Sequence, residues 1–321
     1  MEKILVTGAS GLIGKRVCAG LLKKGYAVVA AGTSFPKHFE DAENFKFTCA
    51  DPGDEAAWNE LFEQEHFDGL VHLACSADND FGNIIETNEM EISAQYDSFI
   101  FKMARQARLK HCILLSTTQV YENPKTREPV NEENNVKPIS NYAVLKRNSE
   151  LQMAADLKGA GDILSCIIRT APVYTHQFCD NLYAKIHDPK DDSNFVYRTG
   201  EYGFHFCCVH NLVDFVICIL KQVDAYTYTG VYNVADKYPI SASEIIEFMT
   251  EFHDLGAVFQ REEPLAKGTF SFLFARIGKP VEECKNDYRH LNLDTILSNL
   301  NFCIAKASRI CPFSWNLENT K

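Results

Sequence analysis

The sequence lacks the features that would embed the protein in a membrane or cross-link it with disulfides. No apolar run approaches the roughly 20 residues that a bilayer-spanning helix requires, and the 321-residue chain contains no C-x-x-C pair. Its 12 cysteines lie mostly inside apolar stretches, so we expect reduced, buried thiols. The opening apolar run breaks at Gly8 instead of continuing as a secretory signal. These absences predict a cytoplasmic protein with no membrane partner.

The sequence also lacks long blocks of like charge, internal repeats and low-complexity tracts. Lys and Arg number 32 against 43 Asp and Glu, which gives a net charge of −11 spread along the chain. That balance argues against an extended nucleic-acid surface, although a local basic pocket for phosphates is compatible with it. Cys207 and Cys208 are adjacent and would face opposite ways on a strand, so they could not share a metal tetrahedron. We predict neither a nucleic-acid partner nor a metal site.

What the first half contains is an alternation of short β-rich runs and amphipathic helices. The periodicity predicts strands over residues 3–7, 26–31, 45–49, 69–74, 111–116 and 163–169. Helices are predicted between them over 12–24, 55–65, 92–107 and 142–158. Apolar strands that alternate with helices form a parallel sheet covered on both faces. The sequence therefore predicts an α/β fold of the Rossmann type, with a doubly wound parallel sheet.

The regular alternation ends after residue 170. Residues 177–203 are irregular and polar, and 188–192 has the composition of a loop. Apolar spacing then predicts helices over 211–221 and 241–251 and a strand over 230–234, with Ser241 and Glu244 as a capping box for the second helix. We predict a main domain over 1–170, rejoined by 204–235, and a smaller substrate-binding region made of 171–203 and 236–321.

A glycine-rich turn joins the first predicted strand to the first helix. Gly8 permits the tight turn, Gly11 lets the backbone approach a pyrophosphate, and Gly14 lets the helix pack closely on the strand. The free N–H groups at the helix start, with the helix dipole behind them, favour an anion. Because the glycines stand between a strand and an amphipathic helix, they predict a dinucleotide site. The residues assigned to it are Gly8, Ser10, Gly11, Leu12, Ile13 and Gly14.

The G-x-x-G-x-x-G spacing resembles that of the short-chain dehydrogenase/reductase superfamily, and two further segments agree. Asp51-Pro52-Gly53-Asp54 follows the third strand, where the family places an aspartate near the adenine. Val71-His72-Leu73-Ala74 matches the family's fourth-strand ending beside the cofactor. The resemblance implies cofactor contacts from Asp51, Pro52, Leu73 and Ala74. We interpret His72 as a residue packed within the sheet.

The end of the second strand bears on which dinucleotide is bound. An NAD site usually has a carboxylate about 20 residues after the glycine turn, which holds the ribose 2′-OH. Gly32 stands at that place, which removes the repulsion of a 2′-phosphate, and Thr33, Ser34 and Lys37 could hydrogen-bond such a group. The alternative is a plain turn that tolerates either cofactor. We predict NADP or NAD, with a preference for NADP.

Two later segments carry the candidate catalytic residues. Tyr142 and Lys146 stand four residues apart, on one face of a helix. The segment Ser116-Thr117-Thr118-Gln119-Val120-Tyr121 follows the fifth strand. Together they resemble the S-[S/T]-x-x-V-Y and Y-x-x-x-K motifs of the extended short-chain dehydrogenase/reductases, the NAD-dependent epimerase/dehydratase type. The resemblance implies catalytic roles for Thr117, Tyr142 and Lys146, and cofactor contacts from Ser116, Tyr142 and Lys146.

The expected chemistry of this centre follows from charge. A free tyrosine has a pKa of roughly 10, too high for a useful base at neutral pH. The Lys146 ammonium and an oxidised nicotinamide would both favour the phenolate and lower the pKa of Tyr142. Tyr142 could then take a proton from a substrate hydroxyl while hydride leaves its carbon, or reverse both steps. Lys146 would also hold the nicotinamide ribose, and Thr117 would hydrogen-bond the reacting oxygen.

Departures from the family pattern bear on the substrate. Related sugar-nucleotide 4,6-dehydratases carry Asp-Glu after the catalytic threonine, whereas Thr118 and Gln119 cannot act as a carboxyl pair, so we expect no such elimination. Family epimerases use an Asn and an Arg at the sugar diphosphate, and here these positions are Pro172 and Phe206, which supply no donor and no charge. Cations that could compensate, or could be plain surface charges, are Arg198, Arg261, Lys267 and Arg276.

The resemblance implies an NAD(P)-dependent enzyme. We predict an epimerase or oxidoreductase that transfers hydride at a secondary alcohol or ketone carbon of a sugar or sugar nucleotide. Pro172 is expected beside the nicotinamide, and Thr118 and Asn181 at the substrate, although the spacing favours a structural role for Thr118. The alternatives are a reductase of a small non-sugar ketone and a non-catalytic NADP-binding regulator. The resemblance also implies a homodimer through the helices at 92–107 and 142–158, whose apolar residues Phe99, Ile100 and Met103 core packing could equally explain.

Overall fold

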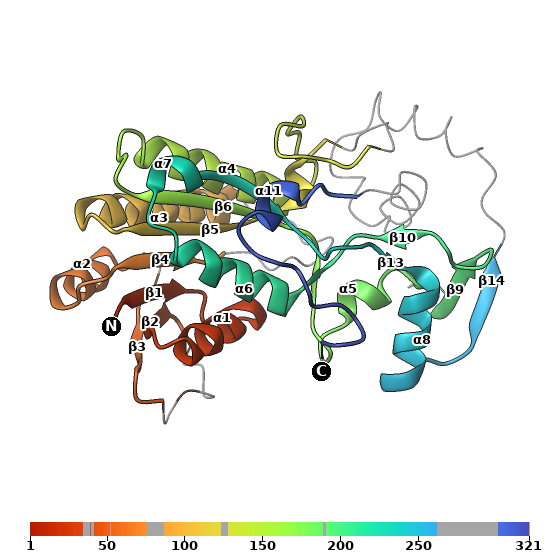
Figure 1. Cartoon of the computed structure of the whole chain (residues 1–321). Helices are drawn as coiled ribbons and strands as arrows, with labels where there is room; N and C mark the ends of the chain where they lie inside the picture. Colours follow the sequence, from red (N-terminus) through yellow and green to blue (C-terminus); the bar gives the residue numbers. More distant parts are fainter. Residues whose placement is uncertain are drawn as a thin grey trace.

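The computed structural model describes residues 1–34, 39, 42–51, 53–75, 87–122, 128–188, 191–261 and 301–320. Its main feature is a seven-stranded sheet in the order β12-β6-β5-β4-β1-β2-β3 (Figure 1). The strands are β1 (Lys3–Thr7), β2 (Ala27–Gly32), β3 (Phe45–Cys49), β4 (Gly69–His72), β5 (His111–Thr117), β6 (Leu164–Thr170) and β12 (Gly230–Val234). Every neighbouring pair in this sheet is parallel, which confirms the predicted Rossmann-type fold.

Helices cover both faces of the sheet because each strand alternates its side chains between two apolar cores. In β1, Ile4 and Val6 join the first core, whereas Leu5 joins the second. Helices α1 (Leu12–Lys23) and α6 (Val209–Leu220) pack together over the first core (Figure 1). The second core is covered by α2 (Glu55–Gln64), α3 (Thr87–Gln106) and α4 (Asn141–Asp156).

Side-chain hydrogen bonds cap the N-termini of helix α4 and of a later helix, α8 (Ala242–Phe252). The Ser140 side chain accepts the N–H of Ala143 at 3.1 Å at the start of α4. Ser241 and Glu244 form a capping box at α8, which confirms the prediction from the sequence. Helix α1 differs, because its N-cap is Gly11 and no side chain caps it. The first N–H groups of α1 are therefore left to another acceptor.

A third core lies beside the sheet. It contains buried residues from the stretches 174–208 and 240–249, together with Leu317. Around it are β7 (Val173–Tyr174), α5 (Asp180–Tyr183), β8 (His187–Asp188), β9 (Ser193–Tyr197), β10 (Gly203–Phe204), β11 (Cys207–Cys208), β13 (Ile240–Ser241), α8 and β14 (Val258–Arg261). The strands pair as β10-β13, β11-β7 and β14-β9-β8. The stretch predicted to be irregular, 177–203, thus contains short regular elements.

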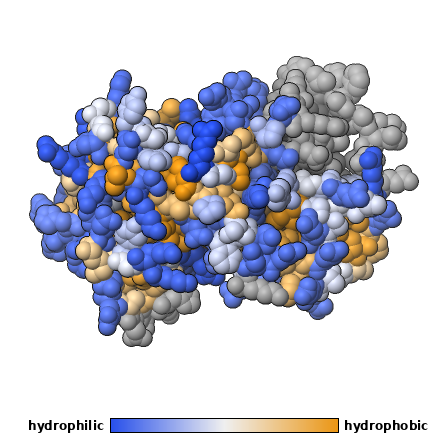
Figure 2. Space-filling view, viewed as in Figure 1, coloured by the Kyte–Doolittle hydropathy of each residue, from blue (hydrophilic) through white to orange (hydrophobic). Residues whose placement is uncertain are grey.

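The last described segment contributes to two of the three cores. Phe302, Cys311 and Phe313 pack into the first core, beside the short helices α7 (Ala225–Tyr228) and α11 (Ala305–Ser308), while Leu317 joins the third. The division of the chain into two domains stays a prediction. Hydrophilic residues cover most of the face seen in Figure 2, with apolar patches between them. None of the helices in the described ranges combines the length and the apolar character that crossing a membrane requires.

Candidate active site

The glycine turn has the geometry of a phosphate cradle. Gly8 adopts φ +68°, and a Cβ added there would lie 2.7 Å from the backbone nitrogen of Ala74. A Cβ on Gly14 would lie 2.1 Å from the carbonyl oxygen of Gly8, so the start of α1 packs against the turn itself. A Cβ on Gly11 would meet only the Gly8 oxygen, at 3.4 Å. Because Gly11 heads the uncapped helix α1, the turn fits an anionic pyrophosphate.

Other residues predicted at the cofactor lie along the same edge of the sheet. Ser10, Leu12 and Ile13 are partly exposed along the turn. The backbone N–H groups of Leu73 and Ala74 each donate to the Thr7 hydroxyl at 3.2 Å, which holds the segment after β4 against Gly8. This arrangement leaves Leu73 and Ala74 half-buried next to the turn.

The end of β2 is open. A Cβ on Gly32 would have no atom of the described residues within 4 Å, and Thr33 and Ser34 are exposed. Asp51 is exposed too, and its carboxylate accepts the N–H of Gly53 at 2.8 Å. Among the described residues, Thr33, Ser34 and Asp51 are thus accessible at this edge of the sheet. Two predicted contacts lie outside the described residues: Lys37 and Pro52.

Ser116 and Pro172, which were also predicted at the cofactor, have polar atoms engaged inside the fold. The Ser116 hydroxyl donates to Glu150 at 2.6 Å, and Glu150 is in turn paired with the buried Arg169. The Pro172 carbonyl accepts the N–H of Cys207 at 3.0 Å. A contact from either residue to a cofactor would have to use its remaining atoms.

The three predicted catalytic residues gather where β5 ends. Helix α4 packs on β5 and on the short 3₁₀ turn η2 (Thr118–Val120). Lys146 is buried, and its ammonium donates to the Leu115 carbonyl at 3.1 Å. The ammonium lies 6.0 Å from the centre of the Tyr142 ring. Thr117 is buried as well, and its hydroxyl accepts the N–H of Gln119 at 3.2 Å, which leaves the hydroxyl proton available to a substrate oxygen.

The electrostatics of Tyr142 differ in part from the expectation. Burial raises the pKa of Tyr142 above its ordinary value, the nearby Lys146 ammonium lowers it, and Cys75 raises it further. The predicted effect of Lys146 is therefore present, but burial outweighs it in the protein alone. For Lys146, burial lowers the pKa while Cys75, Tyr142 and Asp97 raise it, and the net shift is upward. The lysine thus remains an ammonium at neutral pH.

Sequence reasoning missed Cys75, which belongs to this centre. The residue directly follows the Val71–Ala74 segment, is half-buried, and raises the pKa of Lys146. No motif distinguishes this cysteine from the others. Among the described residues every cysteine is a free thiol. His72, by contrast, is fully buried within the sheet, which confirms its interpretation as a packed residue.

The residues predicted on the substrate side are engaged within the fold. Thr118 is buried in η2, and the side chain of Asn181 on α5 donates to the Val173 carbonyl at 2.7 Å. Phe206 is fully buried and packs edge-on against Tyr174 in the third core. Its position therefore faces the interior.

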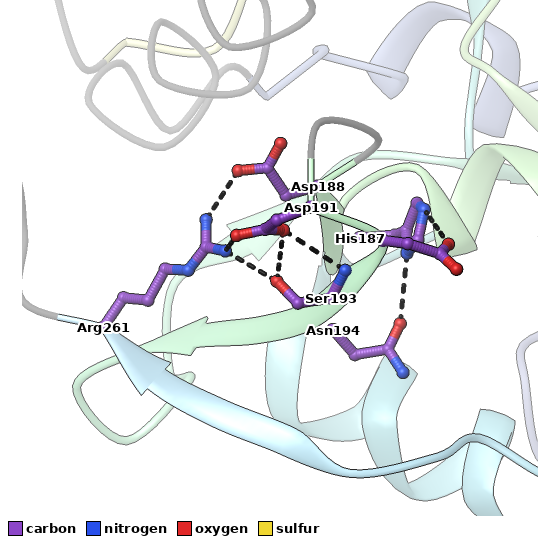
Figure 3. A network of polar contacts seen from close by, with 7 residues as sticks. His187, Asp188, Asp191, Ser193, Asn194 and Arg261 are labelled. Atoms are coloured by element: carbon purple, nitrogen blue, oxygen red, sulfur yellow. Dashed lines mark hydrogen bonds and ion pairs between the residues drawn. The ribbon is translucent and has the colours of Figure 1, made fainter.

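Of the cations that could compensate or be plain surface charges, Arg261 is tied to carboxylates. It donates to Asp188 at 2.7 Å, to Asp191 at 2.9 Å and to the Ser193 hydroxyl at 2.6 Å (Figure 3). Arg198 is exposed. Lys267 and Arg276 lie outside the described residues. Arg261 thus stabilises the β8–β9 turn, and its charge is already balanced.

A parallel sheet whose first strand leads through a glycine turn into helix α1, which no described side chain caps, is typical of dinucleotide-binding α/β proteins. Residues 4–235 match the model of the NAD dependent epimerase/dehydratase family. The chain belongs to this family of enzymes.

Relatives with known names agree with this assignment. The chain is 27% identical over 269 residues to a dTDP-D-glucose 4,6-dehydratase of Dictyostelium discoideum, a match that covers 76% of the chain and 61% of that protein. It is 26% identical over 181 residues to UDP-arabinose 4-epimerase 1 of Arabidopsis thaliana, covering 52% of the chain and 42% of the relative. The chain thus spans about two fifths to three fifths of the length of these relatives.

Solved structures share the fold over nearly the whole chain. A UDP-glucuronic acid 4-epimerase from Bacillus cereus, in complex with UDP-glucuronic acid and NAD, superposes with a TM-score of 0.70 at 20% identity, covering 99% of this chain and 96% of that one. Pal from Bacillus thuringiensis gives a TM-score of 0.71 at 18% identity, with 99% and 96% covered. At these identities the likeness establishes the architecture.

Proposed function

We propose that the protein is an NAD(P)-dependent epimerase or oxidoreductase that transfers hydride at a secondary alcohol or ketone carbon of a sugar nucleotide. The observation that carries the proposal is the Tyr142–Lys146 pair beside the end of β5, in a sheet whose β1 ends in the glycine turn. The relatives' names support the substrate class, since they include UDP-arabinose 4-epimerases and a dTDP-D-glucose 4,6-dehydratase.

In the proposed mechanism the chain supplies the proton chemistry and the positioning. The glycine turn holds the pyrophosphate, and the nicotinamide, when bound, supplies the hydride acceptor. Tyr142 acts as a phenolate, which the Lys146 ammonium stabilises, and it takes the proton from the substrate hydroxyl oxygen to become a neutral phenol. Thr117 donates its hydroxyl proton to the reacting oxygen and fixes its orientation. In the reverse step Tyr142 returns the proton to the same oxygen.

We propose that the protein catalyses no elimination, even though its relatives include 4,6-dehydratases. Thr118 is buried, and the Gln119 amide oxygen accepts a hydrogen bond from Ser140 at 3.4 Å. Neither side chain ionises, so the pair cannot act as acid and base. We expect a product that retains all oxygens of the substrate.

A reductase of a small non-sugar ketone is the second candidate, and specific contacts favour it. Phe206 is buried, the Pro172 carbonyl is engaged, and Arg261 is already paired, so none of them is a ready partner for a diphosphate. Both candidates are tested with a panel of UDP-sugars, dTDP-sugars and non-sugar ketones. Chromatography separates epimers of the same mass, and absorbance measures the change in NAD(P)H. Epimers without net NAD(P)H change support the first, and NADPH consumption with the ketones alone supports the second. Tight cofactor binding without any turnover would instead point to a regulator.

The preference for NADP is part of the proposal, and Gly32 tests it. Aspartate at this open position would repel a 2′-phosphate and accept the ribose 2′-OH, so Gly32→Asp should weaken NADPH binding about tenfold or more, the effect of roughly 1.4 kcal/mol of repulsion. Gly32→Asn is a control of the same size without the charge, and it should change the NADPH affinity little. Fluorescence titration with NADH and with NADPH measures the affinity of each variant for both cofactors, relative to the unaltered protein. Equal losses of NADPH affinity in the two variants would show that the size of the side chain, and not its charge, determines the affinity.

We also propose a cytoplasmic homodimer that acts on a small molecule. Ile92 on α3 and Leu151 on α4 are 49% and 52% exposed, and these two helices pack side by side. Phe99 and Met103 are partly exposed, whereas Ile100 is a buried core residue. Exposed apolar residues on neighbouring helices are typical of subunit contacts. A dimer mass in light scattering supports this arrangement, and a monomer at micromolar concentration contradicts it.

A further inference from the structure

His205 joins two parts of the fold that lie far apart in the sequence. The residue is buried, and its Nε2 atom lies 2.7 Å from the carbonyl oxygen of Asp236, which follows strand β12. Its other ring nitrogen, Nδ1, accepts the backbone N–H of Phe302 at 2.9 Å. Phe302 belongs to the last described segment, residues 301–320, which is drawn in dark blue in Figure 1. The imidazole therefore ties this segment to the end of the parallel sheet.

The two hydrogen bonds determine the protonation state of the imidazole. A backbone N–H can only donate, so Nδ1 of His205 must offer a lone pair to Phe302. A carbonyl oxygen can only accept, so Nε2 must carry the proton that goes to Asp236. Only the neutral Nε2–H form of the ring satisfies both partners. Protonation would add an N–H at Nδ1 that points at the Phe302 N–H, and repulsion would replace the bond.

Phe302 in turn packs against the loop that follows Thr117. Its ring stacks on the His205 ring and on the Tyr121 ring, with centres 5.9 and 6.4 Å away. Tyr121 ends the turn η2, which Thr117 begins. The residues on either side of Phe302 bond through their backbone to Val130, at 2.7 and 2.8 Å. The bond from His205 therefore holds Phe302 against the backbone that positions Thr117.

We propose that His205 is a positioning residue that holds residues 301–303 against the loop after Thr117, and that it does so only as the neutral imidazole. Mild acid protonates Nδ1, breaks the bond to Phe302 and loosens its packing on the Tyr121 ring. The effect on turnover, through the orientation of Thr117, rests on the proposed function, whereas the attachment of the segment does not.

The pKa of His205 is consistent with this assignment. Burial lowers this pKa, the bond to the Asp236 carbonyl raises it, and the net shift is downward. A histidine with a lowered pKa stabilises the attachment fully above the pKa of the unfolded chain, about 6.5, and this stabilisation is lost as the pH falls through the folded value. Between the two values, the released fraction should rise by up to about tenfold for each pH unit.

The Asp236 carboxylate titrates in the same range, but its effect has the opposite sign. Burial raises the pKa of Asp236 to about 6, against the hydrogen bonds that it accepts. A carboxyl with a raised pKa stabilises the fold as the pH falls, so Asp236 does not cause release in acid. Burial also raises the pKa of the phenols and thiols on the neighbouring elements, which therefore stay uncharged: Tyr121 after η2, Tyr174 on β7, and Cys207 and Cys208 on β11.

NMR of protein labelled with ¹⁵N in histidine reads the state of His205 directly. The signal is assigned by its loss in His205→Asn or in His205→Gln. At neutral pH the Nε2 atom should be protonated and Nδ1 should not, and the ring should become a cation only below the ordinary histidine value of about 6.5. A proton on Nδ1 at neutral pH, in the other tautomer or in the cation, overturns the proposal.

The two substitutions separate the two hydrogen bonds. In His205→Asn the side-chain oxygen takes the place of Nδ1 and can accept the Phe302 N–H, but no group titrates. In His205→Gln the terminal amide takes the place of Nε2 and can donate to the Asp236 carbonyl, but the acceptor for Phe302 is gone. Hydrogen exchange of the Phe302 amide, corrected for its intrinsic pH dependence, measures the attachment. Protection should be lost in acid in the unaltered protein, persist in His205→Asn, and be weak at every pH in His205→Gln.

An acid-induced loss of Phe302 protection that is the same in His205→Asn overturns the proposal. So does a simultaneous loss of protection in β5, because that result means global unfolding and not local release. Where a substrate is turned over, the acid limb of the kcat profile should follow the His205 midpoint and disappear in His205→Asn, with KM little changed. An acid limb that His205→Asn leaves in place overturns the positioning role. Absence of turnover in the unaltered protein would remove the proposed function and leave the NMR and exchange results standing.

Discussion

Tyr142→Phe is expected to slow hydride transfer by on the order of a thousandfold, because it removes the group that exchanges a proton with the substrate oxygen. The aromatic ring stays in place and Lys146 keeps its hydrogen bond to the Leu115 carbonyl, so the fold and the cofactor affinity should change little. Single-turnover absorbance of the reduced nicotinamide, with a substrate from the panel above, measures the chemical step. Fluorescence titration measures cofactor binding on the same sample.

Tyr121→Phe is the matched control for this experiment. Its hydroxyl donates to the Asn233 side chain at 2.6 Å, and its ring lies under the Arg169 guanidinium, so Tyr121 is part of the buried core. Losing that hydrogen bond should cost about 1–3 kcal/mol of unfolding free energy and leave the rate per folded molecule unchanged. A Tyr142→Phe protein that transfers hydride as fast as the control would exclude Tyr142 as the acid/base.

The parallel sheet could be predicted because its strands are buried on both faces and its helices on one. Strand β6 was predicted over 163–169 and is found at Leu164–Thr170, a shift of one residue. Helix α3 was predicted to begin at residue 92 and begins at Thr87, since its first turn carries polar residues that add nothing to the apolar periodicity. Local patterns therefore located these elements but not all of their ends.

The short strands of the smaller region could not be predicted in the same way. Strand β9 pairs with β14, more than 60 residues later in the chain, and with the two-residue strand β8. Phe195 and Tyr197 are buried in β9 because of these distant partners. A pattern of five residues inside a polar stretch holds no information about such pairings, so the stretch was interpreted as irregular.

The residues of the candidate site likewise fall into those that a local pattern marks and those that only the tertiary fold brings in. The glycine turn and the Tyr142–Lys146 spacing are local patterns, so the sequence could name them. Cys75 in a loop and Asp97 on another helix raise the pKa of Lys146, and nothing in their own neighbourhoods in the sequence marks them. The effect of burial on the pKa of Tyr142 was missed for the same reason, since burial depends on the whole fold.

The pair of Glu150 and Arg169 is another product of tertiary packing. Arg169 donates to both carboxylate oxygens of Glu150, at 2.9 and 2.7 Å, and the two side chains are 3% and 1% exposed. Ser116 and Arg147 donate to the same carboxylate at 2.6 and 2.7 Å. The pair anchors the helix of Tyr142 and Lys146 to β6 and to the residue that precedes Thr117.

Glu150→Gln should therefore destabilise the protein strongly, by about 3–5 kcal/mol in unfolding free energy, because it leaves the buried Arg169 charge without its partner. Urea unfolding at neutral pH measures the loss. Arg147→Gln is the control, since Arg147 is the partly exposed member of the cluster and a half-exposed ion pair should contribute less than about 1 kcal/mol. A similar loss of unfolding free energy in both variants would show that the buried pair stabilises the fold no more than the half-exposed one.

The pH dependence of this loss gives a second, independent check. Burial would raise the pKa of Glu150, but the bonds from Arg169, Ser116 and Arg147 bring it below its ordinary value. A lowered pKa in the folded state means that the carboxylate stabilises the fold above the pKa of the unfolded chain, about 4.3 for glutamate, and that this stabilisation disappears as the pH falls through the folded pKa. The difference between Glu150→Gln and the unaltered protein should thus be constant near neutrality and shrink below about pH 4. A difference that stays the same at low pH would mean that the glutamine acts through packing, because a protonated Glu150 is as uncharged as the glutamine that replaces it.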